Sequence, residues 1–176
     1  MKQLVLINIF PAQKTDKMVK KRTNLSDFNK ENVPNAKGFT FGIVVSAWNN
    51  SITNNLYKGA YNTLLDCGVN ADDIRRYDVP GSYELVFGAK IAAKSYPDAI
   101  ICLGSIIQGE TKHFDFVCNA VALGIKDLNI QLDIPVIFGV LTDENIDQAI
   151  SRSGGKHGNK GIEAAITAIK MAVLNK

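Results

Sequence analysis

A histidine follows a short glycine-containing segment that could bind an anion. The segment is Gly109-Glu110-Thr111, and it opens a stretch with helical periodicity. Free backbone N–H groups and the positive end of the dipole attract anions to a helix N-terminus, and a glycine lets the backbone approach closely. These residues predict a phosphate-binding site. The alternative interpretation is that Thr111 only caps the helix.

His113 lies two residues after this segment. Its side chain suits proton transfer near neutral pH, since the unperturbed pKa of histidine is about 6.5, and a helix N-terminus favours the neutral form. We expect His113 to act as an acid or a base, although a surface histidine without a task is the alternative. His157, in a glycine-rich turn, is interpreted as a loop residue.

Aromatic and polar side chains stand at other junctions between expected strands and helices. Trp48, the only tryptophan, could stack on a planar heterocycle or simply close the end of the sheet. Ser82 and Glu84 offer acceptors for the hydroxyl groups of a ligand, although helix caps have the same composition. Each residue therefore keeps a functional and a structural interpretation at this point.

Three cations surround the glycines near the C-terminus, namely Arg152, Lys156 and Lys160. Arginine binds two phosphate oxygens at once, so this cluster suits phosphate recognition. Solvated surface charge is the alternative. No dinucleotide fingerprint, P-loop or nucleophile elbow occurs at any strand–helix junction, which argues against several common enzyme classes.

Alternating β-branched runs and stretches of period near 3.6 predict the elements that position these residues. The strands are expected at 41–47, 74–79, 99–104 and 136–140, and the helices at about 52–66, 82–93, 112–129, 146–152 and 159–174. Three strands are nearly continuous apolar runs, as expected when helices cover both faces of a sheet. We predict an α/β three-layer sandwich with a central, mostly parallel four-stranded sheet. In such sheets ligands bind beyond the carboxyl ends of the strands.

Length and composition fit one soluble domain. The chain has 176 residues, 46% of them hydrophobic and 21% charged, so a disordered chain is excluded. A net charge of +3 without a basic run argues against nucleic-acid binding. The longest apolar stretch, 99–107, is too short to cross a bilayer, and we expect no membrane partner.

Cysteine content and the N-terminus bear on cofactor and location. The three cysteines lack metal-ligand spacing, so we expect no bound metal. We expect their thiols to be reduced and the protein to be cytoplasmic, without an export signal. Residues 13–38 are rich in Lys, Asn, Asp and Ser. We expect residues 1–38 to form a flexible arm, with an alternative start at Met18 that would leave 1–17 outside the protein, and 39–176 to form one domain.

From about Phe41 to the C-terminus the chain resembles the lumazine synthase family. The resemblance rests on motifs in the family's order, the longest of them 79–85, 103–114 and 135–142, together with 48–49, 59–60, 148–149 and 159–161. Each motif alone is a modest signal, whereas their joint order and spacing are specific. The resemblance implies a flavodoxin-like fold and a catalytic domain.

The family's reaction is the condensation of 5-amino-6-(D-ribitylamino)uracil with 3,4-dihydroxy-2-butanone 4-phosphate to 6,7-dimethyl-8-ribityllumazine, the penultimate step of riboflavin biosynthesis. The resemblance implies this transferase activity on small-molecule substrates, with no cofactor. It also implies a homopentamer with sites at subunit interfaces, and many members assemble twelve pentamers into an icosahedral shell. The short turn at 152–160 favours the shell over the free pentamer.

The family pattern also implies a role for each matching residue. The proton donor would be His113. The phosphate would be bound by Gly109, Glu110, Thr111 and Arg152, with Lys156 and Lys160 farther away. The pyrimidine and the ribityl chain would be bound by Trp48, Asn49, Ser82, Tyr83, Glu84, Ser105, Ile106 and Ile107, and by Phe138, which faces the site of an adjacent subunit.

Gln108 departs from the family pattern, because members commonly carry arginine at this position. The chain therefore has one positive charge fewer beside the expected phosphate. Two other functions compete with the family's reaction: a non-catalytic flavin- or nucleotide-binding module, and a related riboflavin synthase that consumes the lumazine product.

Overall fold

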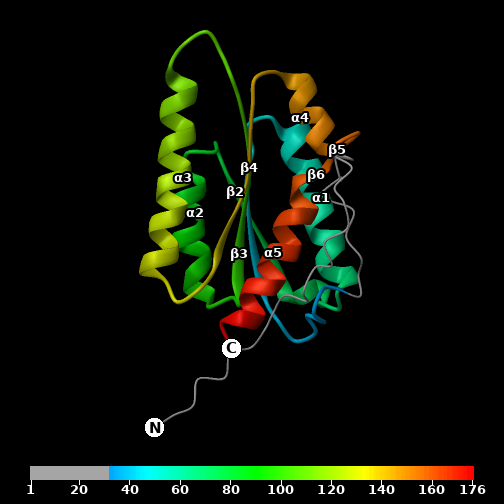
Figure 1. Cartoon of the computed structure of the whole chain (residues 1–176). Helices are drawn as coiled ribbons and strands as arrows, with labels where there is room; N and C mark the ends of the chain where they lie inside the picture. Colours follow the sequence, from blue (N-terminus) through cyan, green and yellow to red (C-terminus); the bar gives the residue numbers. More distant parts are fainter. Residues whose placement is uncertain (1–31) are drawn as a thin grey trace, which may run out of the picture.

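The structure is a computed structural model that describes residues 32–176 (Figure 1). Most of the predicted N-terminal arm, residues 1–31, lies outside the described residues. Inside the remainder of that arm, Ala36 is fully buried and its N–H donates to the carbonyl oxygen of Cys67 at 2.8 Å. The chain just before the first strand is therefore packed on the domain.

Four strands form one parallel sheet in the order β2-β1-β3-β4. Their bounds are β1 (Phe41–Ser46), β2 (Ile74–Val79), β3 (Ala99–Ile107) and β4 (Val136–Asp143). The predicted strands are confirmed, but β3 and β4 each run three residues farther than expected. Their pairing continues from Leu103 to Ile107, beyond the Gly104-Ser105 pair that looked like a strand end in the sequence.

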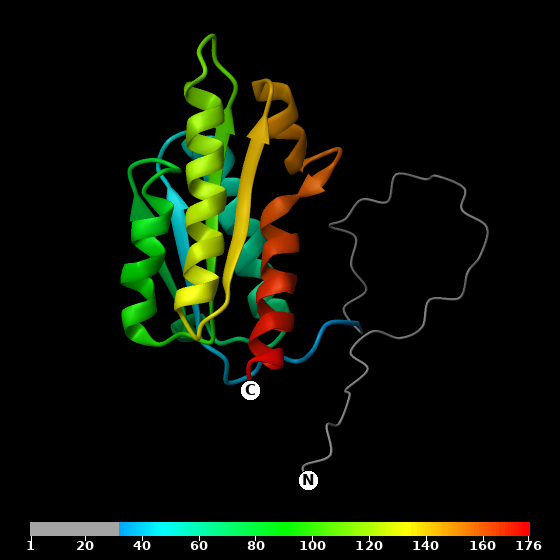
Figure 2. The same cartoon turned by 60° about the vertical axis from the view of Figure 1, so that its left-hand side comes forward.

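Helices cover both faces of the sheet, which confirms the predicted three-layer, flavodoxin-like sandwich (Figures 1 and 2). One face carries α1 (Asn50–Asp66), α4 (Ile146–Arg152) and α5 (Lys160–Leu174), and the other carries α2 (Leu85–Ala92) and α3 (His113–Gln131). Two short 3₁₀ helices, η2 (Ala71–Asp73) and η3 (Ala93–Ser95), precede β2 and β3. Among the described helices, none is long and apolar enough to span a membrane.

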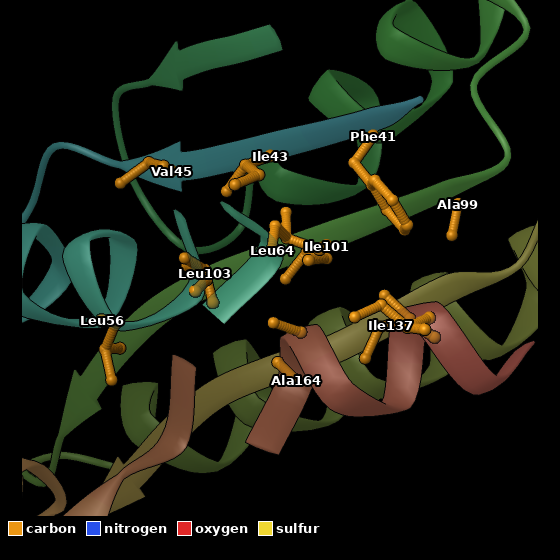
Figure 3. Close-up of a cluster of buried hydrophobic side chains, with 14 of the residues drawn as sticks. Phe41, Ile43, Val45, Leu56, Leu64, Ala99, Ile101, Leu103, Ile137 and Ala164 are labelled. Carbon is orange, nitrogen blue, oxygen red and sulfur yellow. The ribbon is translucent and has the colours of Figure 1, made fainter. Parts of the chain in front are cut away.

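The side chains of each strand alternate between two cores. Phe41, Ile43 and Val45 of β1 point toward α1 and α5, where they pack with Leu56 and Leu64 (Figure 3). The intervening residues of β1, β3 and β4 pack against α2 and α3. A strand alternates with period two, so each position in β3 or β4 belongs to a known face. The same alternation shows which face of the sheet each polar residue at a strand end lies on.

Two helices that begin later than expected and one small hairpin shape the region after the strands. Helix α2 begins at Leu85 rather than at residue 82, which leaves 80–84 as a loop. Helix α3 begins at His113, so residues 108–112 also form a loop. The glycine-rich turn after α4 forms a small antiparallel hairpin of β5 (Ser153–Gly155) and β6 (Gly158–Asn159).

Candidate active site

The carboxyl ends of β1, β2 and β3 and the N-terminus of α3 surround a cleft of about 610 Å³. Most of the residues predicted from the sequence line this one cleft. They are Trp48, Asn49, Ser82, Tyr83, Glu84, Ser105, Ile106, Ile107, Gly109, Thr111 and His113. The cleft also includes Gly81, Phe114 and Val117, which the sequence interpretation did not assign to a site. Gly81 and Phe114 lie in the matching motifs 79–85 and 103–114, whereas the only signal for Val117 is its position one helical turn after Phe114 on α3.

Trp48 stands in a short turn that continues the pairing of β1 with β2. The N–H groups of Ala47 and Trp48 donate to the carbonyl oxygens of Val79 and Pro80 at 2.8 and 3.1 Å. The backbone of Trp48 is thus fixed while its side chain is 71% exposed at the cleft. A large aromatic ring held in this way is available for stacking on a ligand.

Asn49 does not cap α1 with its side chain. It is the N-cap residue, but it adopts the left-handed conformation with φ 56° and ψ 47°. Its Nδ2 instead donates across the cleft to the carbonyl oxygen of Ser105 at 3.1 Å. Asparagine tolerates this backbone conformation better than most residues. The bond ties the turn after β1 to the end of β3.

The loop 80–84 approaches β3 closely because two glycines make room. A Cβ on Gly104 would lie 2.7 Å from Ser82 Oγ, and a Cβ on Gly81 would lie 2.9 Å from Glu84 Oε2. Ser82 is 7% exposed, while Tyr83 and Glu84 are exposed at the rim. Neither Ser82 nor Glu84 makes a side-chain cap bond to α2. Their oxygen atoms are therefore not used up as helix caps.

The end of β3 presents backbone to the cleft. The pairing of β1 with β3 ends at Val45 and Leu103, so within the described chain no strand covers residues 105–107 on that side. The carbonyl oxygen of Ser105 is taken by Asn49. Ser105 is 1% exposed, and its Oγ has no hydrogen-bond partner among the described residues. Backbone groups of a strand edge are strong donors and acceptors for a planar ligand.

The predicted anion loop lies between β3 and α3 at the same end of the sheet (Figure 1). Thr111 Oγ1 accepts from the N–H of His113 at 3.4 Å, a long bond that satisfies one of the free N–H groups of α3. Gly109 would accept a Cβ with nothing within 4 Å. His113 is exposed at the cleft. The arrangement keeps a histidine beside a helix N-terminus, as predicted.

Several predicted residues do not line the cleft of this chain. Phe138 is 37% exposed on β4, the edge strand at the far side of β3. Arg152, Lys156 and Glu110 are exposed, and Lys160 pairs with Glu163 at 2.9 Å. Among residues 32–176, no lysine or arginine lines the cleft. The cationic part of the predicted phosphate site thus lies outside the cleft of the single chain.

Asp143 is an ionisable residue that the sequence interpretation missed. It ends β4, is 4% exposed, and its backbone oxygen accepts from the N–H of Gln108 at 2.9 Å. Burial raises the pKa of this carboxyl group above its usual value, and the positive charge of Arg152 opposes the rise. Its burial had no signal, because the strand was expected to end three residues earlier.

The thiols and acidic groups of the described chain show no metal centre. No cluster of three or more His, Cys, Asp or Glu residues within 32–176 is arranged to hold a metal ion. Cys67 and Cys102 are buried and Cys118 is half-buried. Burial raises the pKa of Cys102 to about 12, so this thiol stays protonated near neutral pH.

Comparison with known proteins places these features in one family. A sequence profile described as 6,7-dimethyl-8-ribityllumazine synthase matches residues 38–176. Proteins of that name are 59% identical over 160 residues in Flavobacterium johnsoniae, covering 90% of this chain and 84% of the relative, and 58% identical over 161 residues in Christiangramia forsetii, covering 90% and 96%. In Porphyromonas gingivalis such a protein is 50% identical over 154 residues, covering 87% and 96%.

Proposed function

The chain belongs to the 6,7-dimethyl-8-ribityllumazine synthase family, and from this premise we propose that it condenses 5-amino-6-(D-ribitylamino)uracil with 3,4-dihydroxy-2-butanone 4-phosphate. The products are 6,7-dimethyl-8-ribityllumazine, phosphate and water. The observation that carries the proposal is the single cleft that joins Trp48, Ser82 and His113 at the carboxyl ends of the strands. This is where parallel α/β sheets bind ligands.

The cleft offers each part of the aminopyrimidine a matching surface. Trp48 stacks on the pyrimidine ring, and the uncovered backbone of 105–107 binds the polar edge of that ring. The hydrogen bond from Asn49 to Ser105 fixes the turn that carries Trp48 relative to the end of β3. The hydroxyl groups of the ribityl chain meet the side-chain oxygens of Ser82 and Glu84 and the exposed Tyr83, which together form the rim.

The butanone phosphate meets the loop before α3. Gly109, Glu110 and Thr111 present the helix N-terminus to the phosphate, and His113 stands within the same cleft. The amine attacks the ketone and loses water to form an imine, phosphate is eliminated, and the second amine closes the ring with loss of another water. His113 moves protons in these steps. Most of the reduction in activation free energy comes from holding the two substrates together. This effect reaches about 7–11 kcal/mol in favourable model cases, against about 3–5 kcal/mol for one acid–base group.

A second copy of the chain completes the site. The cleft lacks a cation for the phosphate, while Arg152 and Phe138 are exposed near the β4 edge of the same molecule. A homo-oligomer brings these two residues of one subunit to the cleft of the next, with Phe138 against the pyrimidine and Arg152 at the phosphate. Lys156, in the exposed hairpin after Arg152, acts on the phosphate at longer range. Lys160, which pairs with Glu163, does the same.

An absorbance assay tests the function directly. The purified protein is incubated with the aminopyrimidine and the butanone phosphate, and formation of the lumazine is followed with time. We expect lumazine and phosphate in equal amounts. Binding of flavin without turnover would indicate a non-catalytic module, and consumption of lumazine with formation of riboflavin would indicate a riboflavin synthase. A cytoplasmic location is an expectation from the sequence, to be tested by cell fractionation.

A further inference from the structure

Asp143 is a buried carboxylate for which the site described above has no use. Its side chain lies on the face of the sheet that α1, α4 and α5 cover, because it is two residues beyond Leu141 in β4. Among the described residues, Asp143 Oδ2 has no hydrogen-bond partner. A buried carboxylate oxygen without a donor is unfavourable, so the position calls for a donor that arrives from nearby.

The backbone of Asp143 is joined to the anion-binding loop. The N–H of Gln108 donates to the carbonyl oxygen of Asp143 at 2.9 Å, and Ile107 is its register partner in β3. Asp143 is therefore fixed at the end of the sheet of its own subunit, from which Arg152 reaches the cleft of the next subunit. A group bound to Asp143 would inherit this fixed position.

Arg152 is the donor that fits. It ends α4, which packs on the same face of the sheet through Ala149, and its positive charge acts on the carboxyl group of Asp143. The ion pairs of the described chain do not include Arg152, so the guanidinium is near the carboxylate without touching it. The side chain of Arg152 is exposed and long, and it lacks a contact that would fix its direction.

We propose that Asp143 is a positioning residue for Arg152 of the same subunit: Asp143 Oδ2 accepts a hydrogen bond from the guanidinium and directs its remaining N–H groups toward the butanone phosphate in the cleft of the next subunit. This inference rests on the proposed function. A guanidinium has five donors in a planar fork, so one bond to the carboxylate leaves enough donors for two phosphate oxygens. Prior fixation also removes rotamer freedom that phosphate binding would otherwise have to remove.

Steady-state kinetics with two variants test the proposal. Asp143→Ala removes the acceptor, and Asp143→Asn keeps the size and one oxygen but removes the charge. We expect Asp143→Ala to raise KM for the butanone phosphate roughly tenfold, the factor for one hydrogen bond to a charged group, with KM for the aminopyrimidine unchanged and a smaller effect of Asp143→Asn. Asp147→Asn, an exposed carboxylate in the first turn of α4, is the matched control and should change neither constant.

The Arg152→Ala background shows whether the effect passes through Arg152. In that background Asp143→Ala should raise KM for the butanone phosphate no further. Equal weakening of both substrates, or full additivity with Arg152→Ala, would overturn the proposal in favour of a structural role. Tighter binding of the butanone phosphate by Asp143→Asn would overturn it as well, because the carboxylate would then only repel phosphate. If Asp143→Ala does not fold, Asp143→Asn carries the same comparison.

Calorimetric titration with inorganic phosphate separates this inference from the proposed function. The wild-type assembly should bind phosphate, and Asp143→Ala should bind it more weakly by a similar factor. If the wild type forms no lumazine but Asp143→Ala still weakens phosphate binding, the function fails and the positioning role stands. If the wild type forms lumazine and phosphate binding is unchanged in Asp143→Ala, the positioning role is overturned.

Discussion

At the scale of single residues, the cleft combines a positioned aromatic ring, a loop of backbone donors and one histidine. The histidine lies four residues after Gly109, which has open space around it, and its own N–H donates to Thr111 Oγ1. Such an arrangement favours orientation of two substrates over a strong nucleophile, because nothing in the cleft activates a serine or a thiol. Asp143 adds a buried charge at the margin of the site.

Replacement of His113 should slow the reaction without stopping it. We expect His113→Ala to lower turnover by about one to three orders of magnitude, because positioning contributes more than proton transfer. Turnover at saturating substrates gives the measurement. His157→Ala is the control, since His157 is the other histidine and lies in the exposed hairpin turn. Unchanged turnover in His113→Ala would remove this residue from the mechanism.

Burial of Asp143 should make stability depend on pH. Its pKa is raised above 3.8 in the folded chain, so the folded state binds the proton more tightly than the unfolded state does. As pH rises from about 3.8 through the raised pKa, the folded state loses stability at this site. We expect Asp143→Asn to melt above the wild type at pH 7, because the positive charge of Arg152 offsets only part of the cost of burying the carboxylate, and we expect the difference to shrink as pH falls toward 3.8.

Thermal unfolding at several pH values measures this difference, with Asp147→Asn as the exposed control. A lower melting temperature for Asp143→Asn at pH 7 would mean that the bond from Arg152 stabilises the carboxylate by more than its burial costs.

At the scale of elements, α1 and α5 pack closely on one face of the sheet. Gly161, in the first turn of α5, allows the backbones to meet, because a Cβ there would lie at 1.9 Å from the carbonyl oxygen of Leu56. The side chain of Asn159 caps α5 by accepting from the N–H of Gly161, and its Nδ2 donates to the carbonyl oxygen of Asn55 in α1. Both contacts set the distance between the helices.

Gly161→Ala should therefore destabilise the protein by about 1–3 kcal/mol or more, the usual cost of overpacking. The sign of the stability change is informative, because helix propensity alone favours alanine over glycine by about 1 kcal/mol and would make the variant more stable. Urea unfolding gives the free energy. Gly109→Ala is the control for stability, because its Cβ would have no neighbour within 4 Å. Equal stability of Gly161→Ala and the wild type would contradict the close contact of α1 and α5.

At the scale of the whole molecule, two residues of the proposed site lie away from the cleft of their own chain. The cleft opens beside β1, β2 and β3, whereas Phe138 lies on the edge strand β4 and Arg152 at the end of α4. A symmetric ring of identical chains is the simplest way to bring Phe138 and Arg152 of each chain to the cleft of the next. In a closed ring with one repeated interface, every cleft has the same neighbour. The proposed pentamer has this property.

We expect purified protein to have the mass of five chains of 19.2 kDa, or of sixty if pentamers form a shell. Light scattering measures this mass. A hybrid experiment tests the shared site: His113→Ala and Arg152→Ala chains are co-expressed, so that some interfaces join an intact His113 to an intact Arg152. Activity above that of either variant alone supports a shared site. A monomer, or hybrids without added activity, would contradict it.

Local patterns in the sequence determined the element order and most of the cleft. The apolar runs of β1, β3 and β4 and the helical periodicities depend on neighbours a few residues apart, so they were visible without a structure. Trp48 and His113 were found because parallel strands place their carboxyl ends together, and a strand–helix junction can be recognised in one dimension.

Features that depend on distant contacts were decided only by the tertiary structure. The extension of β3 to Ile107 requires its pairing with β4, and the bond from Asn49 to Ser105 joins residues 56 apart in the chain. The burial of Asp143 depends on the helices above it, and the position of Arg152 outside the cleft depends on the order of the strands in the sheet. A single sequence carries no local signal for such contacts, because partners far apart in the chain meet only when the sheet and its helices are assembled.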